Sequence, residues 1–165
     1  MYRRIGEFVV TFQWLENRSW EIGWYILNPG RSSGPVRQLR DLTTARLVDA
    51  VSRLFFDGLP KCRLDPELEE DLREAFAAAA ERFHRVRKAR NSILHSAYIE
   101  LKAGGEVQAL LRSNPQLVAD NDPGEKRFDQ ELLSETSFDS EMREMAEVAL
   151  VLNRCYAQLL QRYPA

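Results

Sequence analysis

Strong chemical signals are scarce in this sequence of 165 residues. It has only two cysteines, Cys62 and Cys155, and their spacing fits neither a disulfide framework nor a metal site. No apolar run approaches the ~20 residues needed to cross a bilayer. With 23 basic residues, 25 acidic ones and a net charge of −2, the chain lacks the charge excess that attracts nucleic acid non-specifically. Any role with nucleic acid must therefore rest on a local patch.

Several catalytic and ligand-binding patterns are missing as well. The sequence has no phosphate loop and no dinucleotide fingerprint, and its one Gly-Gly pair reads only as a turn. Ser92 and Ser96 fall within a predicted helix, without the nucleophile elbow of a serine hydrolase. Eleven residues of helix, or ~16 Å, separate His84 from His95, too far to share a metal ion. We therefore expect no metal and no cofactor. The broken apolar pattern at the N-terminus does not resemble a secretion signal, so we expect a cytoplasmic protein with no membrane segment.

Helical spacing of apolar residues is the main signal that is present. It predicts helices over residues 3–27, from Thr43 or Thr44 to about 57, from 65 or 66 to about 97, and from about 137 to 162. In the first helix, Trp14, Trp20 and Trp24 widen the apolar face, which therefore needs a large partner surface.

A period of two follows the third helix and predicts a β-hairpin at about 98–111. Residues 28–35 and 113–127 read as loops, and residues 128–133 as either a short strand or more loop. The composition, 44% hydrophobic and 29% charged, is typical of a globular protein. Since the sequence shows no repeat and no linker between domains, we expect one domain over residues 1–165. The predicted fold class is therefore mainly all-α: a four- to five-helix up-down bundle with a small appended hairpin.

The end of the third predicted helix, residues 82–98, holds both histidines and five basic residues. Arg90 occupies a position on the apolar stripe between Val86 and Ile93, where a cation is costly unless it is paired or faces a cavity or an interface. Beside the stripe runs a polar line, which consists of His84, Lys88, Asn91 and His95. The ordinary alternative is that the basic residues are a solvated face near a helix C-terminus, where cations are favoured.

Arg90, Asn91 and His95 form an Arg-Asn-x-x-x-His pattern on the penultimate long helix of a small helical bundle. This pattern resembles the signature of the HEPN family (higher eukaryotes and prokaryotes nucleotide-binding domain). As sequence, the resemblance covers about a dozen residues around 86–96. It implies a HEPN-type bundle, and the hairpin lies outside the minimal form of that bundle.

The resemblance implies a metal-independent endoribonuclease of a toxin or defence type, with Arg90, Asn91 and His95 as catalytic residues. His95 would act as acid or base, Arg90 would stabilise phosphate charge, and Asn91 would bind phosphate or orient His95. Arg87 and Lys88 would touch substrate phosphates. Positions five apart on a helix point about 140° away from each other, so one copy offers a poor site. The resemblance accordingly implies a homodimer with a composite site, and a cognate antitoxin is a candidate partner.

Two other functions stay open at this stage. In the first, Arg90 and His95 form a polar network inside a non-catalytic interaction module. In the second, Arg90 and Lys88 hold the phosphate of a nucleotide or of RNA without cleaving it.

Overall fold

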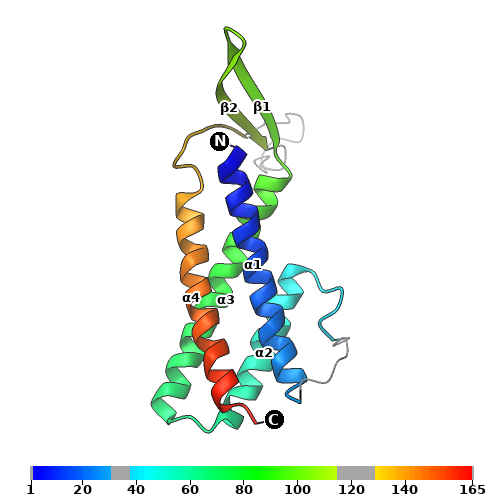
Figure 1. Ribbon diagram of the computed structural model, residues 1–165, viewed down its shortest axis with the longest axis vertical. Coiled ribbons are helices and arrows are strands. Elements are labelled where there is room, and N and C mark those ends of the chain that lie inside the picture. Colours follow the sequence, from blue (N-terminus) through cyan, green and yellow to red (C-terminus); the bar gives the residue numbers. More distant parts are fainter. Residues whose placement is uncertain (1, 31–37, 115–128, 165) are drawn as a thin grey trace, which may run out of the picture.

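A computed structural model describes residues 2–30, 38–114 and 129–164 of the chain (Figure 1). Four α-helices dominate it, joined by one short 3₁₀ helix. They are α1 (Tyr2–Leu27), α2 (Thr44–Gly58), η1 (Leu59–Cys62), α3 (Pro66–Leu94) and α4 (Asp139–Arg162). The predicted mainly helical fold is confirmed. No helix among the described residues is both long enough and apolar enough to cross a membrane.

The three longest helices and α2 share one core. Phe55 of α2 stacks on Phe76 of α3 with ring centroids 4.2 Å apart, and Phe12 of α1 meets Phe83 of α3 edge-on at 5.5 Å. The largest fully buried side chains come from every helix and from the sheet: Phe8, Phe12, Leu15, Ile22, Phe55, Leu59, Leu72, Phe83, Ile93, Leu110, Met145 and Leu159. Burial of these side chains supplies the main driving force for the bundle.

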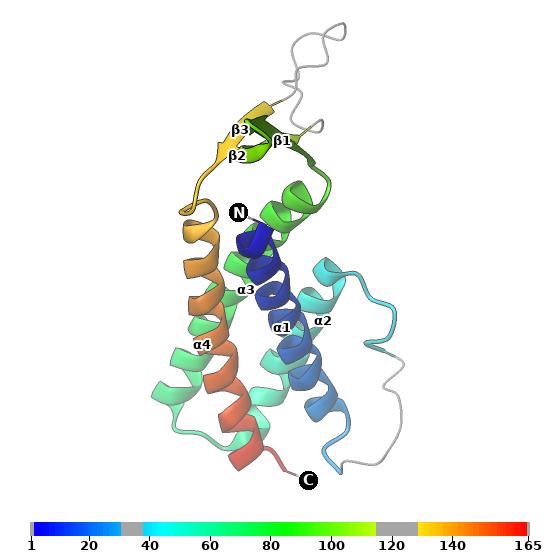
Figure 2. The same cartoon turned by 45° about the horizontal axis from the view of Figure 1, so that its top comes forward.

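The directions of the helices differ from a simple up-down order. The N-terminal part of α1 contacts the start of α4, as Arg4 does Asp139. The C-terminal part of α1 contacts the C-terminal end of α4, where Tyr25 meets Tyr163. Contacts between α3 and α4 run the opposite way. Thr44 at the start of α2 bonds Glu16 in the middle of α1, and Gly58 at the end of α2 lies beside Ile26 near the end of α1. Helices α1, α2 and α4 are therefore parallel, and only α3 is antiparallel to them (Figures 1 and 2). The expected alternation therefore holds only for α2, α3 and α4.

The predicted hairpin is confirmed, and a third strand joins it. Strands β1 (Ala97–Ala103), β2 (Glu106–Asn114) and β3 (Asp129–Leu133) form an antiparallel sheet in the order β1-β2-β3. Gly104 and Gly105 both have positive φ, 62° and 85°, as a two-residue hairpin turn of type I′ requires. Of the predicted loop at 113–127, residues 113 and 114 belong to β2, and the rest lies outside the described residues.

Two boundaries and one packing prediction need correction. α3 ends at Leu94 rather than near Ala97, and α4 starts at Asp139 rather than Ser137. Trp14 and Trp20 do not extend the buried face of α1, because they are 38% and 39% exposed. Trp20 instead stacks on Trp24 at the surface.

The sheet is fastened to the end of α3. Leu110 and Leu133 from the sheet are buried, as is Phe138 just before α4. The Tyr98 hydroxyl donates to the Ile93 carbonyl at 2.8 Å, and Asn114 Nδ2 donates to Ser92 Oγ at 2.5 Å. These bonds fix where the last turn of α3 lies relative to the hairpin.

Candidate functional site

The predicted site lies where α3 extends beyond the start of α2. His84 Nε2 is 3.0 Å from Asp49 Oδ1 of α2, and the two helices are antiparallel. The first residue of α2, Thr44, is therefore level with about residue 89 of α3. Beyond that level α2 no longer covers α3, which explains why the large apolar side chain of Leu94 is 41% exposed.

The basic residues of α3 fall into two groups. In the first group each cation meets a carboxylate of a neighbouring helix: Arg82 pairs with Glu147 and Arg85 with Glu144, both from α4. His84 likewise contacts Asp49. These residues tie helices together, which matches the ordinary alternative for them.

The second group, which we call the unpaired cations, consists of Arg87, Lys88 and Arg90. Within the described residues none of the three forms an ion pair with a carboxylate. The Nε atoms of Arg87 and Arg90 are buried without a hydrogen-bond partner. Three cations within four positions, with no described counter-charge, leave this end of α3 suited to an anion.

Arg90 lies where the apolar stripe predicts it, between the buried side chains of Val86 and Ile93. Its guanidinium sits over the Phe12 ring of α1, with Cζ 5.5 Å from the ring centroid. Its Nη1 donates to Asn91 Oδ1 at 3.1 Å. Asn91 thus contacts Arg90 rather than His95, and the Arg90 side chain is half-buried.

His95 does not continue the helix, contrary to the prediction. It is the C-cap of α3, with φ −97° and ψ 4°, and its backbone N–H still donates to the Asn91 carbonyl at 3.0 Å. The imidazole is exposed, and no side chain among the described residues bonds to it. The residues of the predicted polar line therefore have separate surroundings. His84 contacts Asp49 of α2, Asn91 contacts Arg90, and the exposed His95 contacts neither of them through a described hydrogen bond.

Arg90 and His95 of one copy share no hydrogen bond among the described residues. Arg90 contacts α1, whereas His95 is exposed at the end of α3. The spacing of five residues already predicts this divergence. A reaction that needs both groups on one phosphate therefore requires groups from a second molecule or a different arrangement of these side chains.

The hydrogen bonds around His95 were missed from sequence. Ser96 Oγ donates to the Ser92 carbonyl at 2.6 Å, and Tyr98 and Asn114 bond the same turn from the sheet. The i, i+4 spacing of the two serines was a usable signal for the first bond, since serine hydroxyls often bond the carbonyl four residues earlier. The contacts from the sheet depend on tertiary structure.

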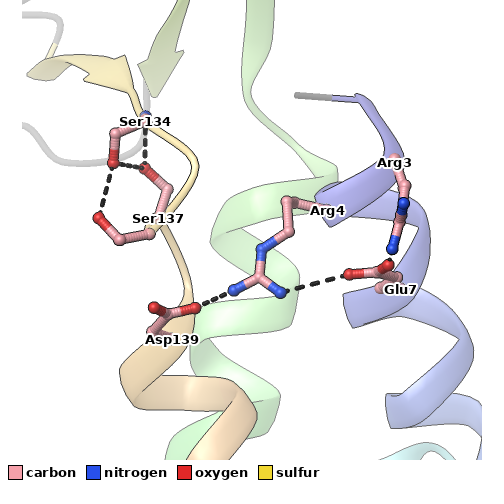
Figure 3. Close-up of polar contacts among 7 residues, drawn as sticks. Arg3, Arg4, Glu7, Ser134, Ser137 and Asp139 are labelled. Atoms are coloured by element: carbon pink, nitrogen blue, oxygen red, sulfur yellow. Dashed lines mark hydrogen bonds and ion pairs between the residues drawn. The ribbon is translucent and has the colours of Figure 1, made fainter.

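A second polar cluster lies at the same end of the bundle, and its hydrogen bonds join α1 to α4. Figure 3 shows Arg4 between Glu7 of its own helix and Asp139 at the start of α4. Hydrogen bonds from Arg3 and then Arg4 lower the pKa of the Glu7 carboxyl. Because Arg4 already meets two carboxylates, it offers little to an added anion. Ser134 and Ser137 bond each other in the adjacent turn.

Within residues 2–30, 38–114 and 129–164, no three His, Cys, Asp or Glu side chains come together as a metal site would need. Comparison of the chain with protein-family models, with curated proteins and with solved structures gave no match.

Proposed function

We propose that this protein is a metal-independent endoribonuclease that works as a homodimer. The observation that carries the proposal is the group of unpaired cations, Arg87, Lys88 and Arg90, which lies about one and a half to two helical turns before the exposed His95. Cations without a described carboxylate can bind a phosphate without first breaking an ion pair. An imidazole takes up and releases protons near neutral pH, as acid–base cleavage of RNA requires.

The reaction would use the 2′-hydroxyl of RNA as its nucleophile. His95 takes the proton from that hydroxyl, whose oxygen attacks the adjacent phosphorus. The bond to the 5′-oxygen breaks, a proton passes to that oxygen, and a 2′,3′-cyclic phosphate is left. Arg90 stabilises the negative charge that builds up on the phosphate oxygens. Asn91 holds Nη1 of Arg90 and so orients the guanidinium.

A composite site follows from the divergence of the two residues. Two copies related by a twofold axis can set Arg90 of one against His95 of the other. Among the described residues, α2 does not cover that end of α3, which supports a contact with a second molecule there. We place the protein in the cytoplasm in this proposal, with a cognate antitoxin as a candidate partner.

The second candidate is a module that binds RNA or nucleotide without cleaving it. The same unpaired cations favour it, because binding phosphate does not require Arg90 and His95 to converge. A pure protein-interaction role is less well supported, since it predicts a buried and satisfied His95, whereas this side chain is exposed.

The decisive measurement is cleavage of labelled single-stranded RNA in excess EDTA. We expect the wild type to cleave and His95→Ala to lose at least about 100-fold in rate, the usual contribution of a general acid or base. His84→Ala is the matched control, because it removes the other histidine and should leave cleavage intact. Equal loss in both variants, or undiminished cleavage by His95→Ala, would contradict the assignment.

Mixing variants tests whether the site is shared. Arg90→Ala and His95→Ala are each expected to be inactive, whereas mixed dimers keep one intact Arg90 opposite one intact His95. Recovery of cleavage on mixing is therefore expected. If no wild-type cleavage occurs on any RNA, but nucleotide or RNA raises the melting temperature, the binding module is the better description.

A further inference from the structure

Strand β1 has an outer edge that no described strand covers. It is the outermost strand of the sheet, and among the described residues only β2 pairs with it. Exposed edges are usually protected by shortness, by charged side chains, by proline or by a bulge. β1 is seven residues long and has no proline, and its two charged residues, Glu100 and Lys102, have opposite signs. The one irregularity, between Leu101 and Lys102, leaves Gln108 of β2 as the extra residue, so β1 itself stays regular.

The two faces of this sheet differ in charge. Residues that alternate along a strand lie on opposite faces, and directly paired residues of neighbouring strands share a face. The face toward the bundle carries the charged side chains: Glu100, Lys102, Arg112 and Glu131. The opposite face carries exposed aliphatic side chains: Ile99 (46%), Leu101 (41%) and Leu132 (60%), with Leu111 between them.

The sequence of β1 is complementary to itself in one antiparallel register. If Leu101 lies opposite Leu101 of a second copy, Glu100 of each chain lies opposite Lys102 of the other. Ile99 then lies opposite Ala103, so the exposed aliphatic side chains gain cross-strand partners. A register centred on Glu100 instead opposes two glutamates, which is destabilising.

We propose that β1 pairs antiparallel with β1 of a second copy, around a twofold axis at Leu101, to form a continuous six-stranded sheet. An isologous contact of this kind needs one surface that is complementary to itself, as β1 is. The backbone groups at this outer edge supply the hydrogen bonds, and the two Glu100–Lys102 pairs select the register.

The shape of the molecule permits this contact. The hairpin of β1 and β2 projects beyond the ends of the helices (Figures 1 and 2). In the proposed register residues 98–104 of the two copies overlap, and the two bundles lie beyond opposite ends of the paired strands.

This contact goes beyond the proposed ribonuclease and does not build its active site. The two Ala97 residues, where the paired strands begin, would lie about 27 Å apart along the strand direction, at ~3.4 Å per residue, and each His95 precedes that end of its strand. A chain with both contacts has two different twofold interfaces, and such chains form tetramers when the two axes are arranged for closure.

Charge reversal tests the pairing through the mass in solution, measured by sedimentation over a range of concentrations. In Glu100→Lys two lysines of one chain would oppose two lysines of the other, and in Lys102→Glu the same holds for glutamates. We expect each variant to show about half the wild-type mass, because one of its contacts is lost. Glu81→Lys, which makes the same charge change on the exposed side of α3, should keep the wild-type mass.

Mixing the two variants gives the sharpest outcome. In the mixed pair, the introduced lysine at position 100 faces the introduced glutamate at position 102, and Lys102 faces Glu100. The wild-type mass should return only in the mixture. Within one strand Glu100 and Lys102 also form an ion pair of 3.0 Å, but loss of that pair cannot be repaired by a second chain.

A wild type that stays a single chain at every concentration would overturn the proposal. So would single variants with unchanged mass, or a mixture in which the mass does not recover. RNA cleavage is scored separately in the same samples. A failure of the ribonuclease proposal, with no cleavage at all, therefore leaves this mass comparison interpretable.

Discussion

Arg90 places a cation on the core-facing stripe of α3, where an apolar side chain would pack more favourably. Its Nε is buried without a partner, and such a group typically costs ~1–3 kcal/mol. We expect Arg90→Met to raise the free energy of unfolding by about 1 kcal/mol, because that cost disappears while the volume is largely kept. Urea unfolding measures the change.

Arg85→Met is the control for this substitution. Arg85 is exposed and pairs with Glu144 at the surface, so its loss should change stability by less than about 0.5 kcal/mol. A marked loss of stability in Arg90→Met would mean that the contacts with Phe12 and Asn91 are structural. The main reason to assign Arg90 a function would then disappear.

Cys155 makes stability depend on alkaline pH. Burial raises the pKa of this thiol to about 12 from its ordinary value of 9.0. Above pH 9 the unfolded chain loses the proton while the folded chain keeps it, so the unfolded state is favoured as pH rises toward 12. The stability contributed by the neutral thiol falls by at most ~1.4 kcal/mol per pH unit.

Comparison with Cys155→Ala isolates that effect, since other groups titrate alike in both proteins. We expect the stability advantage of the wild type over the variant to be constant below pH 8.5 and to shrink between pH 9 and 10.5. Urea unfolding at each pH gives the difference. Parallel curves across this range would show that the thiol ionises as readily in the folded protein as in the unfolded one.

At the scale of the element, α1 carries two glycines that should respond oppositely to the same change. A Cβ at Gly23 would lie 2.7 Å from Leu39 Cδ1 and 2.9 Å from Val51 Cγ2, whereas one at Gly6 would meet nothing within 4 Å. We expect Gly23→Ala to destabilise by about 1–3 kcal/mol through overpacking. Gly6→Ala should stabilise by ~0.5–1 kcal/mol, because alanine favours the helix. Thermal unfolding of each variant measures the change, and a stabilising Gly23→Ala would contradict the close packing of Leu39 and Val51 on α1.

The end of α3 shows why local patterns misplace a boundary. With no glycine or proline until position 104, nothing in the sequence stops the helix before Ala97. The helix stops at Leu94 because the sheet offers its last turn other partners. Tyr98 bonds the Ile93 carbonyl and Asn114 bonds Ser92, from residues that are close only after the hairpin has docked.

At the scale of the whole molecule, apolar stripes predicted the helices but not their neighbours. A stripe shows which face is buried and leaves open which helix buries it. The parallel course of α1 and α2 depends on the connection between them, where Leu39 packs beside Gly23, and this connection has no periodic signal. The same limit applies to the candidate site. The position of Arg90 on the apolar stripe was predictable, whereas the ion pairs of Arg82 and Arg85 were not, because their carboxylate partners come from α4.

The contact between α1 and α4 bears on how the chain is made. Arg4 and Asp139, which join these helices, are 135 residues apart in sequence. A ribosome adds about 5–20 residues per second, so α1 exists for several seconds before α4 emerges. During that time Phe8 and Phe12 lack part of their final cover. The helix that is synthesised first thus completes its packing last, and a chaperone that binds apolar helices would have its longest opportunity there.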